Sequence, residues 1–227
     1  MPYFLISLTA SSLIMPIIIF LTRKFHIMDK PGGRKAHQKP IPLLGGLGIF
    51  AAFALSLLAS ADNITKAIHL IIYSAFIVAV GTVDDIWDIK AIQKLVLQTF
   101  CGLLAALTDI RFHIESFVLT DVPWMSVVDV LVSTAWMIGI TKAVNITDGL
   151  DGLAGGIALI AGSAFAVISV IFGYTVLNQL SSILIGATLG FLIYNFYPAK
   201  LFMGDGGSLF LGFILSVCSI AYVNADR

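Results

Sequence analysis

Three short motifs carry aspartates whose types and spacing suit phosphate chemistry. Two carboxylates are adjacent in the first motif, two are three residues apart in the second, and one stands before two glycines in the third. Adjacent carboxylates repel one another and raise each other's pKa unless a cation is present. A few carboxylates on flexible loops suit Mg²⁺, which usually binds through one or two carboxylates together with substrate phosphates. The motifs are Asp84-Asp85 after Gly81-Thr82-Val83, Asp148 and Asp151 in the run 145–152, and Asp205 before Gly206-Gly207-Ser208.

The surroundings of these acids point to a hard metal ion and not to zinc. Cysteine and histidine do not occur at the spacing of a zinc site. Glycines beside Asp148, Asp151 and Asp205 let backbone and substrate approach closely. The run that begins at Gly206 opens a helix, and a helix N-terminus favours phosphate. Together these features predict a site for Mg²⁺ and a phosphorylated substrate.

The composition excludes several classes of protein. Of the 227 residues, 59% are hydrophobic and 11% are charged, with 13 basic and 13 acidic side chains, and the mean hydropathy is +1.00. Soluble domains carry roughly 25% charged residues. A soluble globular enzyme, a disordered chain and a basic nucleic-acid-binding protein are therefore excluded. A protein that crosses the lipid bilayer several times remains.

Eight apolar runs could span a membrane. A bilayer core about 30 Å thick needs roughly 20 apolar residues per helix. The runs are continuously apolar, which argues against an alternating outer-membrane barrel. Two runs are weaker, because one contains Lys94 and another contains Asp129 and Lys142. The runs are residues 2–22, 43–61, 67–83, 92–108, 122–144, 153–177, 180–199 and 206–225. We predict an all-α, polytopic membrane bundle of about eight transmembrane helices, in a single domain over residues 1–227.

Basic residues predict the orientation of the bundle. No basic side chain precedes the first run, whereas Arg23 and Lys24 follow it at once. The positive-inside rule then places residues 23–42 in the cytoplasm and the N-terminus outside. Alternation of the spans puts all three acidic motifs on the cytoplasmic side, in loops near 84–94, 145–152 and 197–207.

Closely spaced glycines are expected to serve helix packing. Pairs four residues apart let two helices approach closely. A glycine run near residue 45 has no preceding strand, so packing at the start of a helix is a better interpretation than a phosphate loop. The pairs are Gly152 with Gly156 and Gly186 with Gly190, and the run is Gly45, Gly46 and Gly48.

The motifs and their order resemble those of the polyprenyl-phosphate N-acetylhexosamine-1-phosphate transferases. This superfamily includes phospho-N-acetylmuramoyl-pentapeptide transferase and the GlcNAc-1-phosphate transferases of other envelope polysaccharides. The first loop is most similar to the GlcNAc-1-phosphate branch. It reads Asp29-Lys30-Pro31-Gly32-Gly33-Arg34-Lys35-Ala36-His37, followed by Pro40-Ile41-Pro42-Leu43-Leu44-Gly45-Gly46. The resemblance extends over about residues 23–213.

The resemblance implies a reaction at a bacterial plasma membrane. An oxygen of undecaprenyl phosphate attacks the sugar-linked phosphorus of a UDP-N-acetylhexosamine, most simply UDP-GlcNAc. UMP leaves, and a lipid-pyrophosphoryl sugar remains in the membrane. Mg²⁺ is the implied cofactor, with Mn²⁺ as an alternative ion, and a homodimer is one assembly that is allowed. The pentapeptide transferase of peptidoglycan synthesis is the alternative activity.

The resemblance assigns a metal pair and an acidic pair. Asp205 matches the acid that binds Mg²⁺, and Asn145 matches the neutral ligand beside it. Asp84 and Asp85 match the acids that orient or deprotonate the lipid phosphate. Since the second pKa of a phosphate is about 6, a strong base is not obligatory, and positioning is the better role for the acidic pair.

Other residues match positions near the substrates. Asp148 and Asp151 match acids on the nucleotide-sugar side. Lys94 matches a basic residue that faces phosphate, and a lysine that extends to the membrane surface is the alternative. Asn195 matches an amide near the nucleotide, and an interhelical hydrogen bond is the alternative.

The first loop and the end of the chain complete the comparison with the family. Lys39 and His37 belong to the first-loop pattern and are expected to contact substrate. For Lys39 the alternative is a basic residue that only marks the cytoplasmic side of the membrane. Family members continue beyond this point with further spans and a His-rich cytoplasmic loop, so a C-terminally truncated member is expected. An inactive truncated homologue is therefore a second alternative. A secondary transporter is disfavoured, because transporter acids lie within broken helices near the bilayer centre.

Overall fold

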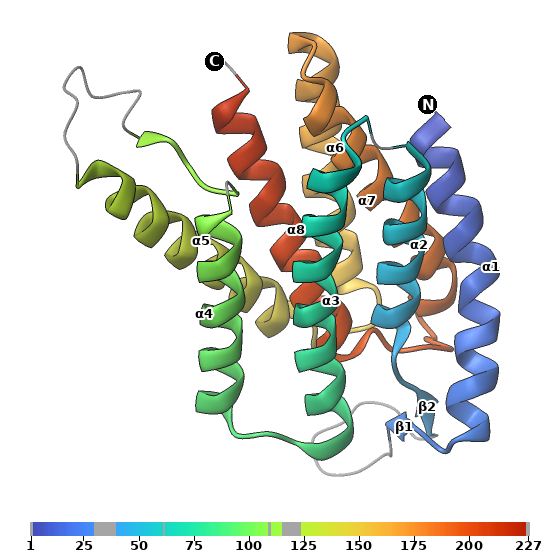
Figure 1. Ribbon diagram of the computed structural model, residues 1–227. Coiled ribbons are helices and arrows are strands. Elements are labelled where there is room, and N and C mark those ends of the chain that lie inside the picture. Colours follow the sequence, from blue (N-terminus) through green and yellow to red (C-terminus); the bar gives the residue numbers. More distant parts are fainter. Residues whose placement is uncertain (1, 30–39, 61, 109, 115–123, 226–227) are drawn as a thin grey trace.

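The computed structural model describes residues 2–29, 40–60, 62–108, 110–114 and 124–225, which form eight helices and two short strands (Figure 1). The helices are α1 (Pro2–Lys24), α2 (Gly45–Ser60), α3 (Ile64–Trp87), α4 (Ala91–Leu107), α5 (Met125–Thr147), α6 (Leu153–Phe172), α7 (Thr175–Asn195) and α8 (Gly204–Asn224). The strands β1 (Met28–Asp29) and β2 (Ile41–Pro42) pair antiparallel. The prediction of an all-α, polytopic membrane bundle is confirmed.

The lengths of the helices differ from those of the predicted spans. Six helices are long and apolar enough to cross a membrane, whereas α2 and α4 have 16 and 17 residues. At 1.5 Å per residue these two helices rise about 25 Å, less than a bilayer core of about 30 Å. By contrast, α5 was a weak prediction and has 23 residues. Its charges are compatible with a long helix because Asp129 is fully buried and Lys142 is half-buried.

The turn between α6 and α7 falls at the start of the loop that alternation of the spans predicts outside, over residues 173–178. The apolar runs themselves break only between residues 177 and 180, whereas α6 ends at Phe172 and α7 begins at Thr175. Gly173 ends α6 with a φ of +76°, a left-handed conformation that glycine adopts without strain. The runs alone missed this turn because both helices are apolar up to it.

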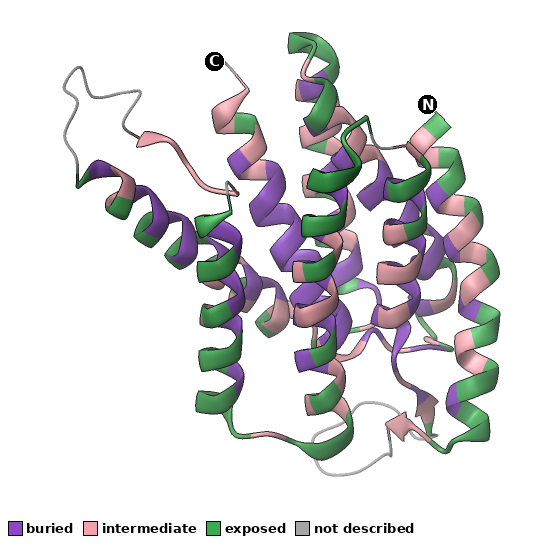
Figure 2. Ribbon diagram, in the orientation of Figure 1, coloured by how far each residue is buried: buried purple, intermediate pink, exposed green. Residues whose placement is uncertain are grey.

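Helix α8 runs through the centre of the bundle, where most of its residues are buried (Figure 2). It packs against α3 and α5, and also against α2 and α6. Phe210 and Phe213 are almost completely buried, and the ring of Phe210 meets that of Phe53 edge-on at 5.4 Å between centroids. The beginning of α8 is therefore fixed by protein contacts from several helices.

Glycines bring the first turn of α8 against α2 and α3. A Cβ atom on Gly81 would lie 2.4 Å from the Cα of Gly206, and one on Gly46 would lie 2.2 Å from the nitrogen of Gly207. These distances leave no space for a side chain, so the helices touch backbone to backbone. The predicted packing role of Gly46 is confirmed.

The two glycine pairs have different outcomes. A Cβ atom on Gly186 or Gly190 would lie 2.5 or 2.6 Å from atoms of α1, which confirms close packing between α7 and α1. The prediction of close packing is wrong for Gly156, which has no neighbour within 4 Å of a built Cβ. Gly152 precedes α6 with a φ of +74°, and a Cβ atom there would lie 2.9 Å from Cδ1 of Phe196. Gly155 packs against α7 instead.

Candidate active site

Lys94 joins two of the predicted acids at one end of the bundle. It lies in the first turns of α4 and is buried, with 6% of its surface exposed. Its Nζ donates to Oδ2 of Asp84 at 2.7 Å and forms a second ion pair with Oδ2 of Asp205. Asp84 belongs to the last turn of α3 and Asp205 to the first turn of α8. Three separate helix ends therefore meet at this ammonium group.

Asn145 fixes the other oxygen of the Asp205 carboxylate. Its Nδ2 donates to Asp205 Oδ1 at 3.0 Å and to Ser208 Oγ at 2.9 Å. The carboxylate of Asp205 thus lies between Lys94 and Asn145, the residue that the family resemblance assigns as its partner. The sequence suggested only that Ser208 lies at the start of a helix. Its hydrogen bond with Asn145 could not be found from spacing, because Asn145 belongs to a different helix, α5.

Asp85 has a different environment from Asp84. Its Oδ1 accepts from the backbone N–H of Asp205 at 2.7 Å, and its Oδ2 accepts from that of Gly206 at 3.2 Å. The first amides of a helix lack partners within the helix and carry partial positive charge, so a carboxylate stabilises them. The N-terminus of α8 was expected to favour phosphate, but Asp85 occupies two N–H groups of its first turn, those of its second and third residues.

Asp84 is held by its own chain as well as by Lys94. Its Oδ1 accepts from the N–H of Ile89 at 2.9 Å. This bond closes the turn after α3, in which Asp88 adopts a left-handed φ of 50°. Both oxygens of Asp84 therefore have partners, which orients the carboxylate toward Lys94.

Asp151 and Asn195 connect two loops beside the acidic cluster. Asn195 is buried, accepts from the N–H of Gly152 at 2.9 Å and donates to the carbonyl of Leu201 at 2.9 Å. Asp151 Oδ2 accepts from the N–H of Ala199 at 3.0 Å. These bonds fasten the segment before α8 to the segment before α6. Both side chains therefore hold the backbone of these loops in place, a role that the motif match alone did not specify.

Asp148 lies directly after α5 and is half-buried. Burial raises the pKa of its carboxyl from 3.8 to about 7, and the negative charge of Asp85 contributes in the same direction. The carboxyl group of Asp148 therefore titrates near neutral pH. The electrostatic contact with Asp85 also links the second acidic motif to the first.

The first loop begins and ends at the same end of the bundle as the cluster. Strands β1 and β2 pair there, on the side of the bundle where α3 ends and α4 begins (Figure 1). Pro42 accepts from the N–H of Phe202 at 2.8 Å, and Gly46 donates to the carbonyl of Met203 at 2.8 Å. The end of the loop is thus bonded to the residues before Asp205. His37 and Lys39 lie outside the described residues.

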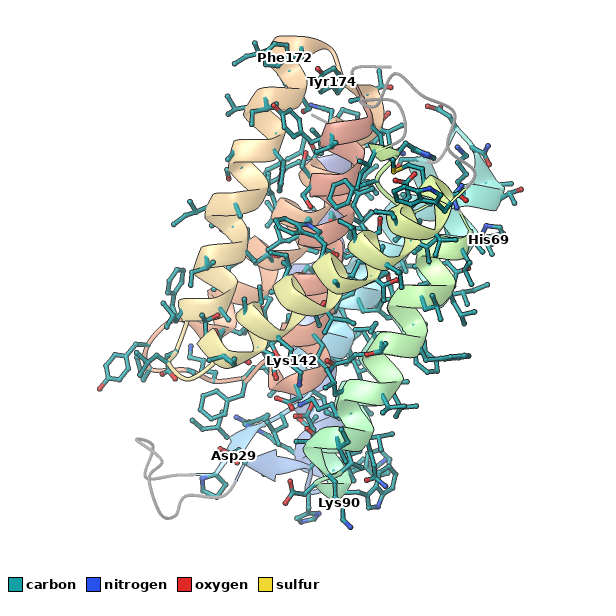
Figure 3. All side chains as sticks on the ribbon, turned by 90° about the vertical axis from the view of Figure 1, so that its left-hand side faces the viewer. Asp29, His69, Lys90, Lys142, Phe172 and Tyr174 are labelled. Atoms are coloured by element: carbon teal, nitrogen blue, oxygen red, sulfur yellow. The ribbon has the colours of Figure 1, made fainter. Side chains whose placement is uncertain are left out.

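Lys142 is a member of this region that the sequence predictions missed. Its charge interacts with those of Lys94 and Asp84. The available signal was a lysine inside an apolar run, three residues before Asn145. Figure 3 shows Asp29 and Lys90 at one end of the bundle, Lys142 a little above them, and Phe172 and Tyr174 at the opposite end.

The donors in the cluster suit a hard cation. Asp205 supplies carboxylate oxygens of the kind that bind Mg²⁺. Asn145 lies beside them with its Nδ2 toward Oδ1, so its amide would have to turn to present its oxygen to a metal ion. Within the described ranges, no group of three or more histidine, cysteine, aspartate or glutamate side chains could hold a metal ion. A metal bound here would therefore depend on few protein ligands, as is usual for Mg²⁺ bound with phosphate.

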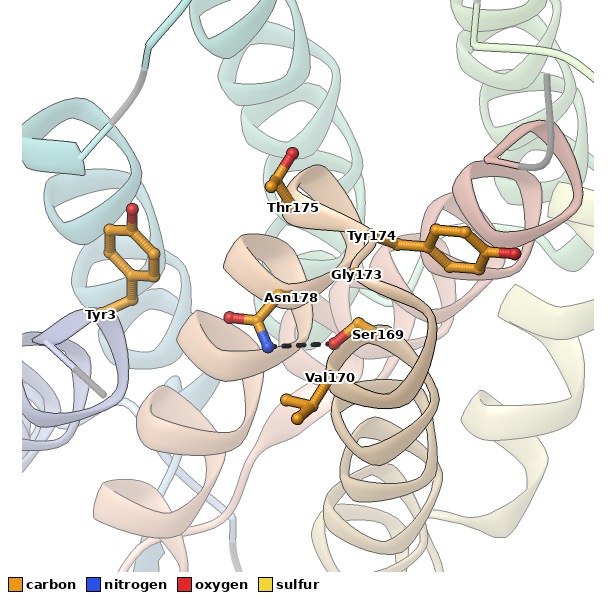
Figure 4. Close-up of a pocket in the computed structure, with 7 residues that line it drawn as sticks. All are labelled: Tyr3, Ser169, Val170, Gly173, Tyr174, Thr175 and Asn178. Carbon is orange, nitrogen blue, oxygen red and sulfur yellow. Dashed lines mark hydrogen bonds between the residues drawn. The ribbon is translucent and has the colours of Figure 1, made fainter.

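A pocket of about 320 Å³ lies at the opposite end of the bundle, between the start of α1 and the turn from α6 to α7 (Figure 4). Its polar lining includes Asn178, which donates to Ser169 Oγ at 3.0 Å. None of the predicted site residues lines it. The lining residues are Tyr3, Ser169, Val170, Gly173, Tyr174, Thr175 and Asn178.

Comparison with known proteins gives one family and two kinds of relative. The model of glycosyl transferase family 4 matches residues 67–223. The chain is 38% identical over 225 residues to a probable undecaprenyl-phosphate N-acetylglucosaminyl 1-phosphate transferase of Bacillus subtilis (strain 168), covering 96% of this chain and 61% of that protein. It is 32% identical over 243 residues to the phospho-N-acetylmuramoyl-pentapeptide-transferase of Staphylococcus carnosus (strain TM300), covering 98% and 75%. The Staphylococcus aureus (strain Newman) protein of the same name is 30% identical over 240 residues, covering 96% and 75%.

Proposed function

Because the chain belongs to glycosyl transferase family 4, we propose that it transfers N-acetylglucosamine 1-phosphate from UDP-GlcNAc to undecaprenyl phosphate. The name of the Bacillus subtilis relative supports this choice of substrates, and the chain spans 61% of that relative. The observation that carries the proposal is the junction of Asp84, Lys94, Asp205 and Asn145 at one end of a membrane bundle. A lipid acceptor in the bilayer and a water-soluble donor can meet only at such an end.

The proposed reaction exchanges one phosphorus–oxygen bond for another. An oxygen of the lipid phosphate attacks the sugar-linked phosphorus of UDP-GlcNAc. The bond from that phosphorus to the bridging oxygen breaks, and this oxygen leaves as part of UMP. Phosphoryl transfer is catalysed mainly by positioning and by stabilisation of charge. The protein therefore needs fixed cations and fixed carboxylates more than it needs a strong base.

The contacts of each acid suggest how the work is divided. Asp84 binds Lys94 with one carboxylate oxygen while the N–H of Ile89 holds the other oxygen. These contacts support a role for Asp84 in holding that lysine against a phosphate. Asp85 holds the start of α8, which supports a role for Asp85 in positioning Asp205 and not in abstracting a proton. Asp148 exchanges its proton near neutral pH, which suits contact with either a hydroxyl group or a cation.

Mg²⁺ is the proposed cofactor, with Asp205 and Asn145 as its protein ligands. Bound Mg²⁺ would neutralise charge on the diphosphate and on the leaving UMP. Asp205 is suited to this role because its side chain is 32% exposed while both oxygens are oriented. Lys94 pairs with the same carboxylate and adds a second positive charge to the region. Together the two cations could balance several negative charges of bound phosphates.

The first test measures transfer of tritium-labelled GlcNAc 1-phosphate from UDP-GlcNAc into organic-extractable lipid by membranes that contain this chain. We expect label in the lipid, and we expect chelation of divalent cations to abolish it. Full turnover in the presence of a chelator would exclude Mg²⁺ as the cofactor. Label that appears only after the remaining part of the Bacillus subtilis relative is fused to the chain would favour an inactive truncated homologue.

The staphylococcal relatives support a second candidate donor. Their names describe transfer of phospho-N-acetylmuramoyl-pentapeptide, and two of them are 30% and 32% identical to this chain. The same assay with UDP-N-acetylmuramoyl-pentapeptide distinguishes the two donors. Transfer from this donor alone would replace the proposed sugar while leaving the phosphoryl-transfer chemistry intact.

The proposed orientation has the acidic cluster in the cytoplasm and the N-terminus outside. The basic residues at the two ends support it, because Arg23, Lys24, Lys90 and Lys200 accompany the cluster while Lys66 accompanies the N-terminus. We expect Lys90→Cys to react with a membrane-impermeant maleimide only from the cytoplasmic side. The matched Lys66→Cys variant should react only from outside, and both positions are exposed. Cys101 and Cys218 are buried. The reverse pattern of labelling would contradict the orientation.

A further inference from the structure

Lys142 is a charged side chain inside a membrane helix. It lies on α5, three residues before Asn145, and residues three apart share one face of a helix. An ionisable group inside a membrane-spanning segment is costly and usually marks a functional site. The side chain is half-buried, so it is neither enclosed in the core nor free in solvent.

The charge of Lys142 acts on the acidic cluster. It is attracted by Asp84 and repelled by Lys94. Figure 3 places Lys142 between the membrane part of the bundle and the end that carries Asp29 and Lys90. Helix α5 therefore contributes a cation as well as the amide of Asn145 to the same region.

The two lysines of the region differ in their partners. The ammonium group of Lys94 is bound by the carboxylates of Asp84 and Asp205. Among the residues that the structure describes, Lys142 has no hydrogen-bond or ion-pair partner. An ammonium group has three donors, so Lys142 can donate to an incoming anion without breaking a bond.

We propose that Lys142 binds a phosphate oxygen of a substrate in the transfer reaction. Two ammonium groups within electrostatic range repel one another, and an anionic phosphate bound beside them removes that repulsion. A lysine binds phosphate as a point charge and requires no single geometry. The phosphate belongs either to the diphosphate of the nucleotide sugar or to the lipid. This inference rests on the proposed function and adds a substrate-binding residue to it.

The test compares Lys142→Gln with Lys142→Arg and with the control Lys24→Gln. Lys24 is exposed at the end of α1, so its replacement removes the same charge away from the cluster. Loss of a hydrogen bond to a charged group typically weakens binding about ten- to hundredfold. We expect Lys142→Gln to raise KM for one substrate by that factor and to change kcat less. The arginine variant should retain most of the affinity.

Binding measurements identify which phosphate is bound and test for a merely structural effect. If the diphosphate is the partner, Lys142→Gln weakens binding of UDP about tenfold or more and leaves binding of uridine within twofold. If the lipid phosphate is the partner, UDP binding is unchanged and KM for undecaprenyl phosphate rises. Equal weakening of UDP and uridine would overturn the inference, as would an unchanged KM for both substrates.

Failure of this inference is distinguishable from failure of the proposed function. A wild-type chain that transfers sugar phosphate, together with an indifferent Lys142→Gln variant, overturns the role of Lys142 alone. A wild-type chain that transfers from no nucleotide sugar and binds no UDP overturns the proposed function and the role of Lys142 together. If Lys142→Gln does not fold, Lys142→Arg provides the test. This variant keeps the positive charge, so a loss of affinity for both substrates would contradict the proposal.

Discussion

Asp205→Asn is expected to lower the rate of sugar-phosphate transfer about a thousandfold while leaving the bundle folded. The substitution keeps the size of the side chain and an oxygen that can accept from Asn145. It removes the negative charge that pairs with Lys94 and that we propose binds Mg²⁺. The measurement is turnover with UDP-GlcNAc and undecaprenyl phosphate at saturating Mg²⁺, together with the thermal midpoint in detergent with and without Mg²⁺.

Asp62→Asn is the matched control for this prediction. Asp62 is exposed and lies before α3, at the end of the bundle opposite the cluster. The control should retain turnover and any stabilisation by Mg²⁺, whereas Asp205→Asn should lose both. Retained turnover in Asp205→Asn would remove Asp205 from the proposed metal site, even if the chain proved to be a transferase.

The sequence was most informative where composition and motif order act together. Continuous apolar runs predicted eight helices, and the structure has them. The helix ends were predicted less well, because an apolar turn such as the one at Gly173 has no polar signal. The run at 122–144 was rated weak because Asp129 was counted against a membrane helix, yet α5 has the same length and begins three residues later. In the structure Asp129 is fully buried and accepts from the N–H of Ile114, so it does not face lipid.

The candidate site could be predicted as a set of residues but not as a set of contacts. Residue type and motif order brought Asp84 and Asp205 into one hypothesis, and the family resemblance added Asn145. Spacing cannot tell which of two adjacent acids turns toward Lys94 and which turns toward the backbone of α8. That division depends on the close approach of Gly81 to Gly206, which places Asp85 beside the first amides of α8. It is a consequence of helix packing, and no local pattern encodes it.

Lys94→Gln is expected to change metal binding and turnover in opposite directions. The substitution leaves the carboxylates of Asp84 and Asp205 without the ammonium group that joins them. Breaking a buried ion pair is strongly destabilising, and partial exposure of Asp205 reduces the loss to about 1–2 kcal/mol. For a chain of this length the thermal midpoint in the absence of Mg²⁺ should then fall by about 4 °C.

Addition of Mg²⁺ should restore more stability to Lys94→Gln than it adds to the wild-type chain. A cation that enters the cluster of the variant meets two unpaired carboxylates and no competing ammonium group. Turnover should nevertheless fall about a hundredfold or more, since the positive charge proposed to face the phosphate is missing. Lys90→Gln is the control, because Lys90 is exposed at the start of the same helix. Weaker Mg²⁺ binding by Lys94→Gln would contradict a shared carboxylate, and unchanged turnover would contradict a contact between Lys94 and phosphate.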